Sequence, residues 1–189
     1  MKRLTLIIAI VISLPLFSHA QEPAIEVGDQ FVNFGLGLGS VTFRGSGYST
    51  VIPPLSVSYE KIIRDGILDE GYIGVGAYLG FSSYKWSYAF VGTDWGWSYT
   101  TILPGARASF HYPIIDNIDT YTGLLLGYQI VSAKETGTSV IGTYNATTSG
   151  IAWSWYAGGR YFLSDNFMIM AELGYGITYL NIGVALKLP

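Results

Sequence analysis

The sequence predicts an all-β protein, an eight-stranded antiparallel up-and-down transmembrane β-barrel. The first observation is strict alternation near the end of the chain. Over 167–177, and again over 180–188, hydrophobic side chains occupy every second position, and the positions between them hold methionine, alanine, glycine or polar residues. Successive residues of a strand point to opposite faces of the sheet, so this pattern indicates strands with one apolar and one polar face.

The composition is the second observation. Charged residues make up 12% of the chain, against about 25% in ordinary soluble domains. After the first twenty residues, no run approaches the ~18 uninterrupted apolar residues of a spanning helix. Only helices and closed barrels satisfy their backbone hydrogen bonds in lipid, so an apolar chain without such a helix favours a barrel.

The N-terminus has the features of a secretory signal peptide. Lys2 and Arg3 provide a basic start, an apolar core follows, and small residues lead to a cleavage site after Ala20. The apolar core is shorter than the roughly 20 residues of a transmembrane anchor, which is the alternative. We therefore expect a signal peptide over 1–20 and an outer-membrane β-barrel domain over 21–189.

The charge balance and the cysteine count exclude several classes of function. Without Lys2 and Arg3 the chain has 8 basic and 13 acidic residues, a net charge of about −5, which excludes nucleic acid as a partner. It has no cysteine, so no disulfide framework is expected. One histidine after the signal peptide and no cysteine leave few metal ligands, and we expect no metal and no cofactor.

The first half of the mature chain holds four predicted strands, at 30–39, 55–61, 71–82 and 97–112. In each, apolar residues alternate with glycine, serine, tyrosine or a charged residue. Proline cannot donate to a strand ladder, so Pro53 and Pro54 are expected at the start of the second strand. Pro104 lies inside the fourth strand, where we expect a local bulge.

The second half holds four more predicted strands, at 120–130, 151–163, 167–177 and 180–188. Leu125 is an apolar exception on the inner face of the fifth strand. The predicted connections are 40–50, 62–70, 83–96, 113–119, 131–150, 164–166 and 178–179. Most of them alternate between long and short, as the extracellular loops and periplasmic turns of outer-membrane barrels do, and an even strand number puts both termini in the periplasm.

Charge placement indicates which face lies inside. A soluble lipocalin-like barrel, the alternative, would enclose the Leu and Val face. The charges within strands are Glu60, Arg107, Arg160 and Glu172, and all four share the glycine-rich face. Eight strands enclose a lumen that side chains can fill, and buried charges persist there only when they are paired. The sequence therefore predicts a lumen charge network of these four residues.

Aromatic residues gather at both expected edges of the membrane, where a ring can keep one end apolar and the other wet. Those near the periplasmic turns are Tyr59, Tyr112 and Tyr121, and those near the outer rim are Trp95, Trp97, Trp153 and Trp155.

Two segments carry a resemblance to a known family. The run after Arg160, YFLSDNFMIMAELGYGITYLNIGVALKL, resembles the closing hairpins of small bacterial outer-membrane β-barrel proteins of the OmpA/OmpX-like type. GARASFHY and IDTYTGLLLGYQI are similar to the middle hairpin of that family. The resemblance covers nearly the whole mature chain and implies residence in the bacterial outer membrane.

The same resemblance implies a C-terminal assembly signal read by the barrel-assembly machinery. The matching residues are Asn181, Gly183, Leu186 and Leu188. The chain ends on Pro189, where such proteins usually end on an aromatic residue.

Three functions remain open: a structural or interaction barrel whose loops contact an extracellular surface ligand, a narrow pore or small-solute transporter, and a lipid-modifying enzyme. Eight strands disfavour an open channel. His111, the only mature histidine, is expected near the periplasmic end as a packing residue and not as a catalytic base at the outer rim. The sequence therefore favours an interaction barrel surrounded by outer-membrane lipid, without enzymatic activity.

Overall fold

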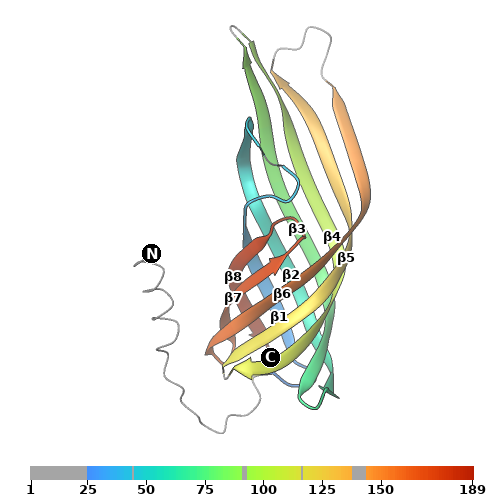
Figure 1. Cartoon of the computed structure of the whole chain (residues 1–189), viewed down its shortest axis with the longest axis vertical. Helices are drawn as coiled ribbons and strands as arrows, with labels where there is room; N and C mark the ends of the chain where they lie inside the picture. Colours follow the sequence, from blue (N-terminus) through green and yellow to red (C-terminus); the bar gives the residue numbers. More distant parts are fainter. Residues whose placement is uncertain (1–24, 44, 91–92, 116, 138–143) are drawn as a thin grey trace, which may run out of the picture.

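Eight antiparallel strands close into a barrel in which each strand pairs with the next and β1 pairs with β8 (Figure 1). The computed structural model describes residues 25–43, 45–90, 93–115, 117–137 and 144–189. The strands are β1 (Gln30–Leu38), β2 (Tyr48–Ile67), β3 (Gly71–Phe90), β4 (Thr93–Ile115), β5 (Ile118–Gly137), β6 (Asn145–Ser164), β7 (Phe167–Gly174) and β8 (Leu180–Leu188). The predicted fold class is confirmed, and the expected signal peptide lies outside the described residues.

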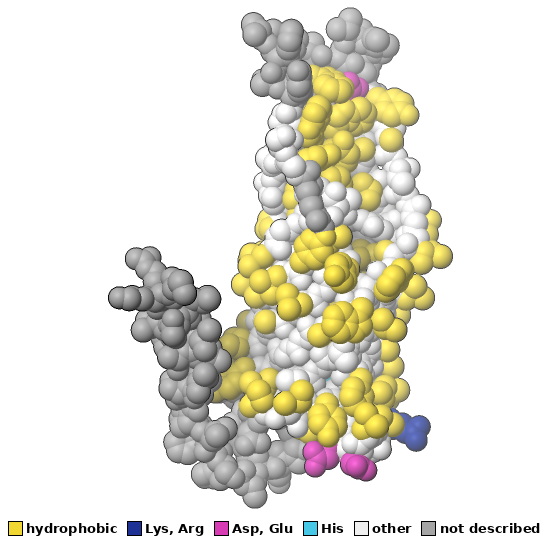
Figure 2. Space-filling model, viewed as in Figure 1, with side chains coloured by type: hydrophobic (Ala, Val, Ile, Leu, Met, Phe, Trp, Pro, Cys, Tyr) yellow, Lys and Arg dark blue, Asp and Glu magenta, His cyan; other side chains and the backbone are white. Residues whose placement is uncertain are grey.

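The exterior of the barrel is apolar. Leu124, Leu126 and Leu173 are each about 60% exposed, whereas Glu60 and Arg160 on the opposite face are fully buried. Figure 2 shows hydrophobic side chains spread over the side of the barrel, with charged side chains mainly at its lower end. A soluble barrel would have the opposite arrangement, so the prediction that the Leu and Val face is outside is confirmed. No helix among the described residues is long and apolar enough to cross a membrane.

The strands differ greatly in length. β1, β7 and β8 have 8 or 9 residues, while β2 to β6 have 20 to 23. β2 pairs with β1 only over 55–61, and β6 pairs with β7 only over 156–164. Beyond these limits, β2 to β6 continue as an open five-stranded sheet, which we call the extension (Figure 1).

The extension corrects the predicted loops. Most of 83–96 and the ends of 131–150 are paired strand, and the last three residues of the first expected loop, 48–50, belong to β2 and pair with β3. These segments are rich in Tyr, Trp, Thr and Ser, which favour extended backbone. The pairing of these strands therefore continues beyond the part of the barrel in which apolar and polar residues alternate strictly. At the other end, β2 continues through the expected turn to Ile67, and the chain reverses at Leu68 and Asp69, which have φ values of 54° and 76°.

The prolines are accommodated differently from the prediction. Pro53 and Pro54 lie inside β2, where the register with β3 shifts between Ile52 and Leu55. β1 does not pair with this part of β2, so the missing N–H groups are tolerated there. The bulge expected at Pro104 is wrong: Pro104 pairs in register with Leu79, and the register with β5 is the same before and after it.

The lead-in before β1 closes the end of the barrel where β1 begins and β8 ends. Ile25 is 5% exposed and packs with Phe31, Ile62, Met168 and Ala185. Its segment is held by the Gly28 N–H, which donates to the Ile62 carbonyl, and by the Lys187–Asp29 ion pair at 2.7 Å. We call this end the terminal end of the barrel.

Candidate functional site

The lumen charge network is centred on Arg160 of β6. Its guanidinium pairs with Glu60 of β2, and Nη1 lies 3.6 Å from Oδ2 of Asp119. The guanidinium carbon also lies 4.4 Å from the centre of the Phe31 ring and 4.8 Å from that of Tyr121. The two carboxylates and the rings surround the cation, so this fully buried charge is paired.

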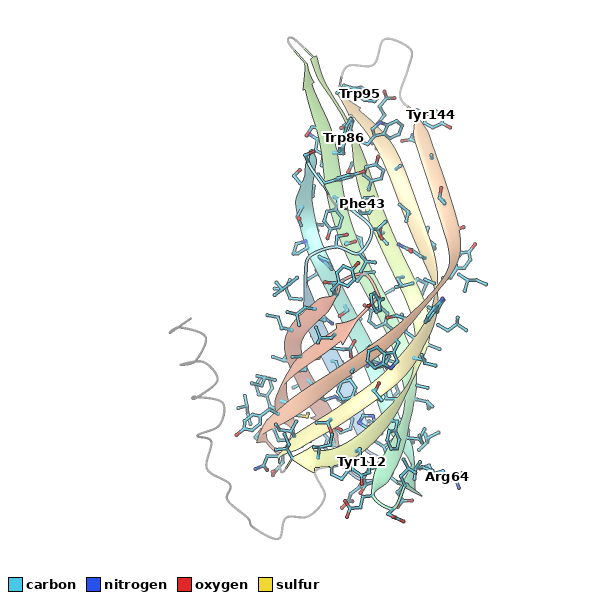
Figure 3. The ribbon with its side chains drawn as sticks, viewed as in Figure 1. Phe43, Arg64, Trp86, Trp95, Tyr112 and Tyr144 are labelled. Carbon is cyan, nitrogen blue, oxygen red and sulfur yellow. The ribbon has the colours of Figure 1, made fainter. Side chains whose placement is uncertain are left out.

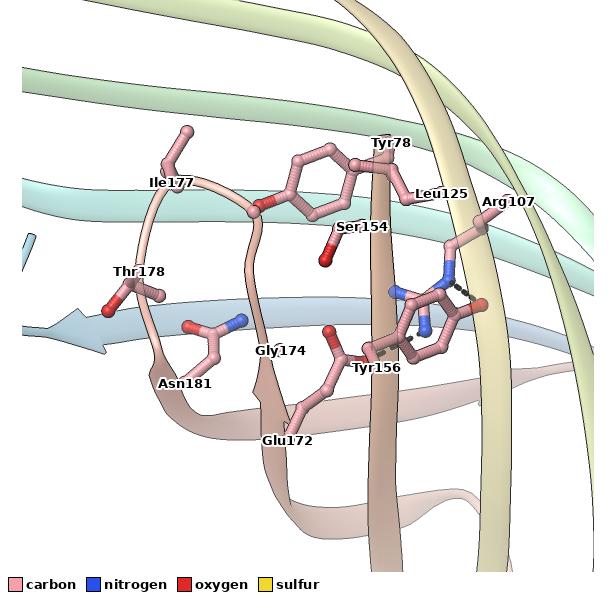
Figure 4. Close-up of a pocket in the computed structure, with 11 residues that line it drawn as sticks. Tyr78, Arg107, Leu125, Ser154, Tyr156, Glu172, Gly174, Ile177, Thr178 and Asn181 are labelled. Carbon is pink, nitrogen blue, oxygen red and sulfur yellow. Dashed lines mark hydrogen bonds and ion pairs between the residues drawn. The ribbon is translucent and has the colours of Figure 1, made fainter. Parts of the chain in front are cut away.

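Arg107 of β4 makes a second ion pair further along the lumen. Its Nη2 lies 2.8 Å from Oε2 of Glu172, and Nε donates to the Tyr156 hydroxyl at 3.0 Å (Figure 4). Nη1 donates to Ser58 Oγ at 3.3 Å. The guanidinium also stacks on Tyr156, 4.1 Å from the ring centre. Tyr121 donates its hydroxyl to the same Glu172 oxygen at 3.2 Å.

Ser109 joins the two ion pairs. Its Oγ donates to Glu60 and lies 2.8 Å from the Tyr156 hydroxyl, which in turn accepts from Arg107. The structure thus brings Glu60, Arg107, Arg160 and Glu172 into one hydrogen-bonded network, contributed by strands β2, β4, β6 and β7.

His111 and Asp119 complete the network at the terminal end. His111 Nδ1 lies 2.7 Å from Asp119 Oδ1, and Nε2 lies 3.4 Å from Glu60 Oε1. Three carboxylates therefore face two guanidinium groups, and the His111 ring lies between Glu60 and Asp119. The described residues contain no group of three or more His, Cys, Asp or Glu side chains arranged to hold a metal ion.

Sequence reasoning missed Asp119 because it falls in the predicted turn 113–119. β5 begins at Ile118, so Asp119 shares the inner face with Tyr121. Extending the alternation of the fifth strand by two residues would have found it. The alternation in the sequence places Ser109 and Tyr156 on the inner face. However, an uncharged side chain at an inward position does not indicate that it takes part in a hydrogen-bonded network.

Glycines create the space for these large side chains. A Cβ atom on Gly74 would lie 2.9 Å from Glu60 Oε1 and 3.0 Å from His111 Nε2, and one on Gly158 would lie 2.9 Å from the Tyr121 hydroxyl. The inward glycines are therefore packing partners of the network.

The rest of the lumen is filled by side chains. Next to the network lie the buried residues Tyr78, Leu103, Tyr121, Leu125, Tyr156 and Ile177. A cavity of about 20 Å³ remains beside Arg107 and Glu172, which is room for roughly one water molecule (Figure 4). Leu125 is the inward exception that the sequence predicted. Ile177 corrects the predicted outward pattern of 167–177, because β7 ends at Gly174 and the following loop turns this side chain inward.

Aromatic rings close the lumen towards the extension. Phe43, from the connection between β1 and β2, has its ring centre 5.2 Å from that of Tyr84 and 4.9 Å from that of Tyr99 (Figure 3). Tyr48 completes the group at 5.7 Å from Phe43. The described lumen is therefore packed from Ile25 at one end to Phe43 at the other.

The aromatic rim is only partly as expected. Trp153 and Trp155 are 72% and 50% exposed on the exterior, and Tyr59 and Tyr112 lie outside near the terminal end. Tyr121 is 5% exposed inside the lumen and belongs to the network instead. Trp95 and Trp97 share the inward parity of Arg107 on β4, so they face the concave side of the extension.

The residues of the expected assembly signal lie on β8. Asn181 points inward and donates to Ser56 Oγ at 2.8 Å, and Gly183 pairs with Gly35 of β1 and Met170 of β7. Leu186 and Leu188 face outward and are 38% and 37% exposed. The set therefore presents two apolar side chains outside the seam where the barrel closes.

The chain is similar to known proteins in its structure and not detectably in its sequence. No family model and no curated protein sequence matches the chain. Ail, the attachment invasion locus protein of Yersinia pestis, solved in complex with the heparin analogue sucrose octasulfate, matches with a TM-score of 0.50 and 14% identity over 86% of this chain and 96% of Ail. The N-terminal β-barrel domain of OprF from Pseudomonas aeruginosa matches with a TM-score of 0.48 and 15% identity over 85% of this chain and 97% of that domain. The chain therefore has the eight-stranded antiparallel barrel fold of the OmpA/OmpX-like type that Ail represents.

Proposed function

We propose that the protein is an integral barrel of the bacterial outer membrane, exported by a signal peptide over 1–20, that holds the extension outside the cell to contact surface ligands. The observation that carries this proposal is the combination of an apolar exterior with a side-chain-filled lumen and a projecting sheet. In such a protein the barrel fixes the chain in the membrane, and the residues that bind ligands lie in the part outside it.

The short strands give the level of the membrane. β1 and β8 have 9 residues each, which matches the ~9–11 residues of a tilted strand that crosses a bilayer. β1 begins and β8 ends at the terminal end, and in a barrel with an even number of strands this end faces the periplasm. The extension then begins at the outer rim and lies in the extracellular medium.

The terminal strand is proposed to carry the assembly signal of Asn181, Gly183, Leu186 and Leu188. β8 closes the barrel by pairing with β1 along its whole length. A signal on this strand reports a complete barrel to the barrel-assembly machinery, because β8 is the last strand of the barrel to be made.

The packed lumen argues against the two other functions. A pore needs a continuous passage, and the described lumen holds ion pairs, a hydrophobic cluster and a cavity of about 20 Å³. A lipid-modifying enzyme needs a base that reaches its substrate, and His111 is 0% exposed between Glu60 and Asp119. An anchor with an interaction surface is consistent with both observations.

Single-cysteine labelling of intact cells tests the proposal, since the natural chain has no cysteine. Thr147→Cys lies at the exposed end of β6 in the extension, and Asp65→Cys lies in the exposed part of β2 at the terminal end. A membrane-impermeant maleimide should label Thr147→Cys in intact cells and Asp65→Cys only after the outer membrane is opened. A faster-migrating unheated band on a gel should accompany both variants. Labelling of Asp65→Cys alone, or a soluble periplasmic protein, would contradict the proposal.

A further inference from the structure

Four aromatic side chains at the end of the extension form a continuous row, which we call the aromatic ladder: Trp86, Trp95, Trp97 and Tyr144. Figure 3 shows three of them at the far end of the long strands. Successive ring centres lie 5.9, 6.2 and 6.1 Å apart, at interplanar angles of 89°, 81° and 78°. Edge-to-face contact of this kind is the preferred geometry of aromatic pairs.

The ladder lies on the concave side of the extension. The register of β4 with β3 is unbroken from Thr93 to His111, so Trp95 and Trp97 share the face of Arg107, which points into the lumen. Trp86 pairs directly with Trp97 across the two strands and has the same orientation. The ladder therefore continues the inner surface of the barrel beyond the membrane.

Glu135 of β5 fixes the ladder in place. The Trp95 indole Nε1 donates to its Oε1 at 2.5 Å, and the Tyr144 backbone N–H donates to its Oε2 at 3.0 Å. The Glu135 N–H donates in turn to the Tyr144 carbonyl at 3.0 Å. Rings that are already ordered lose little conformational entropy when a ligand binds, so this arrangement is preorganised for recognition.

The placement of the charged side chains in the extension argues against a polyanionic ligand on its concave side. Among its described side chains, Lys85 and Lys134 are the cations, and the alternation of β3 and β5 turns both to the convex side, where they are exposed. Partial burial, with Tyr48 alongside, raises the pKa of the Tyr99 phenol, so this neighbouring ring stays neutral. Glu135 is the carboxylate of the face, and both its oxygens accept hydrogen bonds from the protein.

The ring spacing and the neighbouring residues further limit the chemical class of ligand that the ladder can bind. Centres about 6 Å apart in edge-to-face contact leave no space between rings for an ammonium group, so the ladder is not a cation cage. Tyr144 is 63% exposed, and Trp95 and Trp97 are partly exposed, so part of each of these side chains is accessible to a ligand. On β6, the concave side also carries Ala146 and Thr148, which are smaller than the leucines and isoleucines outside the barrel.

We propose that the aromatic ladder binds a neutral saccharide chain. The apolar C–H face of a sugar ring stacks on an indole or phenol ring, and the hydroxyl groups around its edge bond to threonine, backbone and water. An ordered aromatic surface with few aliphatic side chains, whose carboxylate is already hydrogen-bonded by the protein, suits such a ligand better than an apolar peptide. This assignment rests on the proposed function, because only an extension outside the cell meets an extracellular glycan.

The test uses the full mature barrel in lipid nanodiscs with maltohexaose, cellohexaose and chitohexaose as neutral probes and heparin as a polyanionic probe. Titration calorimetry and tryptophan fluorescence report binding. We expect at least one neutral probe to bind and heparin not to compete. Trp97→Ala should weaken that binding at least tenfold, and Trp153→Ala, a matched change on the convex side, should leave it unchanged.

Tyr144→Ala provides a second variant at the exposed end of the ladder, in case Trp97→Ala does not fold, and it should also weaken binding. Absence of binding to all three neutral probes, preference for heparin, or equal binding by the wild type and both ladder variants would refute the assignment. If binding fails while Thr147→Cys is labelled from outside the cell, the saccharide assignment is wrong and the surface-interaction proposal stands. If Thr147→Cys is not labelled, both are wrong.

Discussion

Replacing Arg160 by Met tests whether the lumen network is held by paired charges. Arg160 is 0% exposed and faces Glu60 and Asp119, so the substitution leaves two buried carboxylates without their guanidinium partner. Removing one partner of a buried ion pair costs about 3–5 kcal/mol. We expect a loss of this size in the free energy of unfolding, because methionine preserves most of the side-chain volume but none of the charge.

Urea unfolding in lipid vesicles, followed by fluorescence of the 5 tryptophans, measures this loss. The double variant Glu60→Gln/Arg160→Met should be more stable than the sum of the two single losses predicts, because the second change removes a carboxylate that the first left unpaired. Lys187→Met is the matched control: its ion pair with Asp29 has side chains 26% and 15% exposed, and its loss should cost less than about 1 kcal/mol. A loss below about 1 kcal/mol for Arg160→Met, or additive losses in the double variant, would refute the reasoning.

Three further predictions concern packing and can be measured by the same unfolding assay. Gly74→Ala places a Cβ within 3.0 Å of Glu60 and His111 and should destabilise the barrel by about 1–3 kcal/mol. In the control Gly150→Ala, the added Cβ has no atom within 4 Å, and stability should change little. Equal effects of the two changes would contradict the role of the inward glycine. Ile25→Ala should cost about 2–5 kcal/mol if the lead-in is a true part of the core, and no loss would mean that it is dispensable. Ser109→Ala removes the bridge between the two ion pairs and should cost about 1–3 kcal/mol, while Ser132→Ala, at an exposed position of β5, should be neutral.

The sequence predicts the membrane-spanning part of the barrel well because lipid imposes a strict pattern there. A residue such as Leu124 or Leu126 faces hydrocarbon and must be apolar, while Glu60 and Arg160 are tolerated only inside. This two-sided requirement repeats at every second position, and it fixed the faces of all eight strands. It also placed the four charges of the network on one face before any contact between them was known.

The extension follows a weaker rule. Outside the membrane both faces of a strand meet water, so Trp95, Trp97 and their neighbours lose the apolar and polar alternation by which the strands were recognised. The prediction of a turn over 62–70 failed in a similar way. Gly66, a residue typical of turns, has a positive φ of 69° but lies inside β2. The joining of the network by Ser109 could not be predicted either, since a hydroxyl on the inner face is equally compatible with simple packing.

The Glu60–Arg160 contact joins residues 100 positions apart, and the pairing of β1 with β8 joins the two ends of the domain. The first contact requires the chain as far as residue 160, and the second requires it as far as β8. Glu60 therefore reaches the inside of a barrel with its charge balanced only when β6 is in place, and the ring closes only when β8 arrives. Contacts at such long sequence separation slow folding, and here they also couple burial of the charges to completeness of the chain. A chain that ends before β6 keeps Glu60 without its guanidinium partner on an open sheet, where burial of this carboxylate in an apolar surrounding is unfavourable.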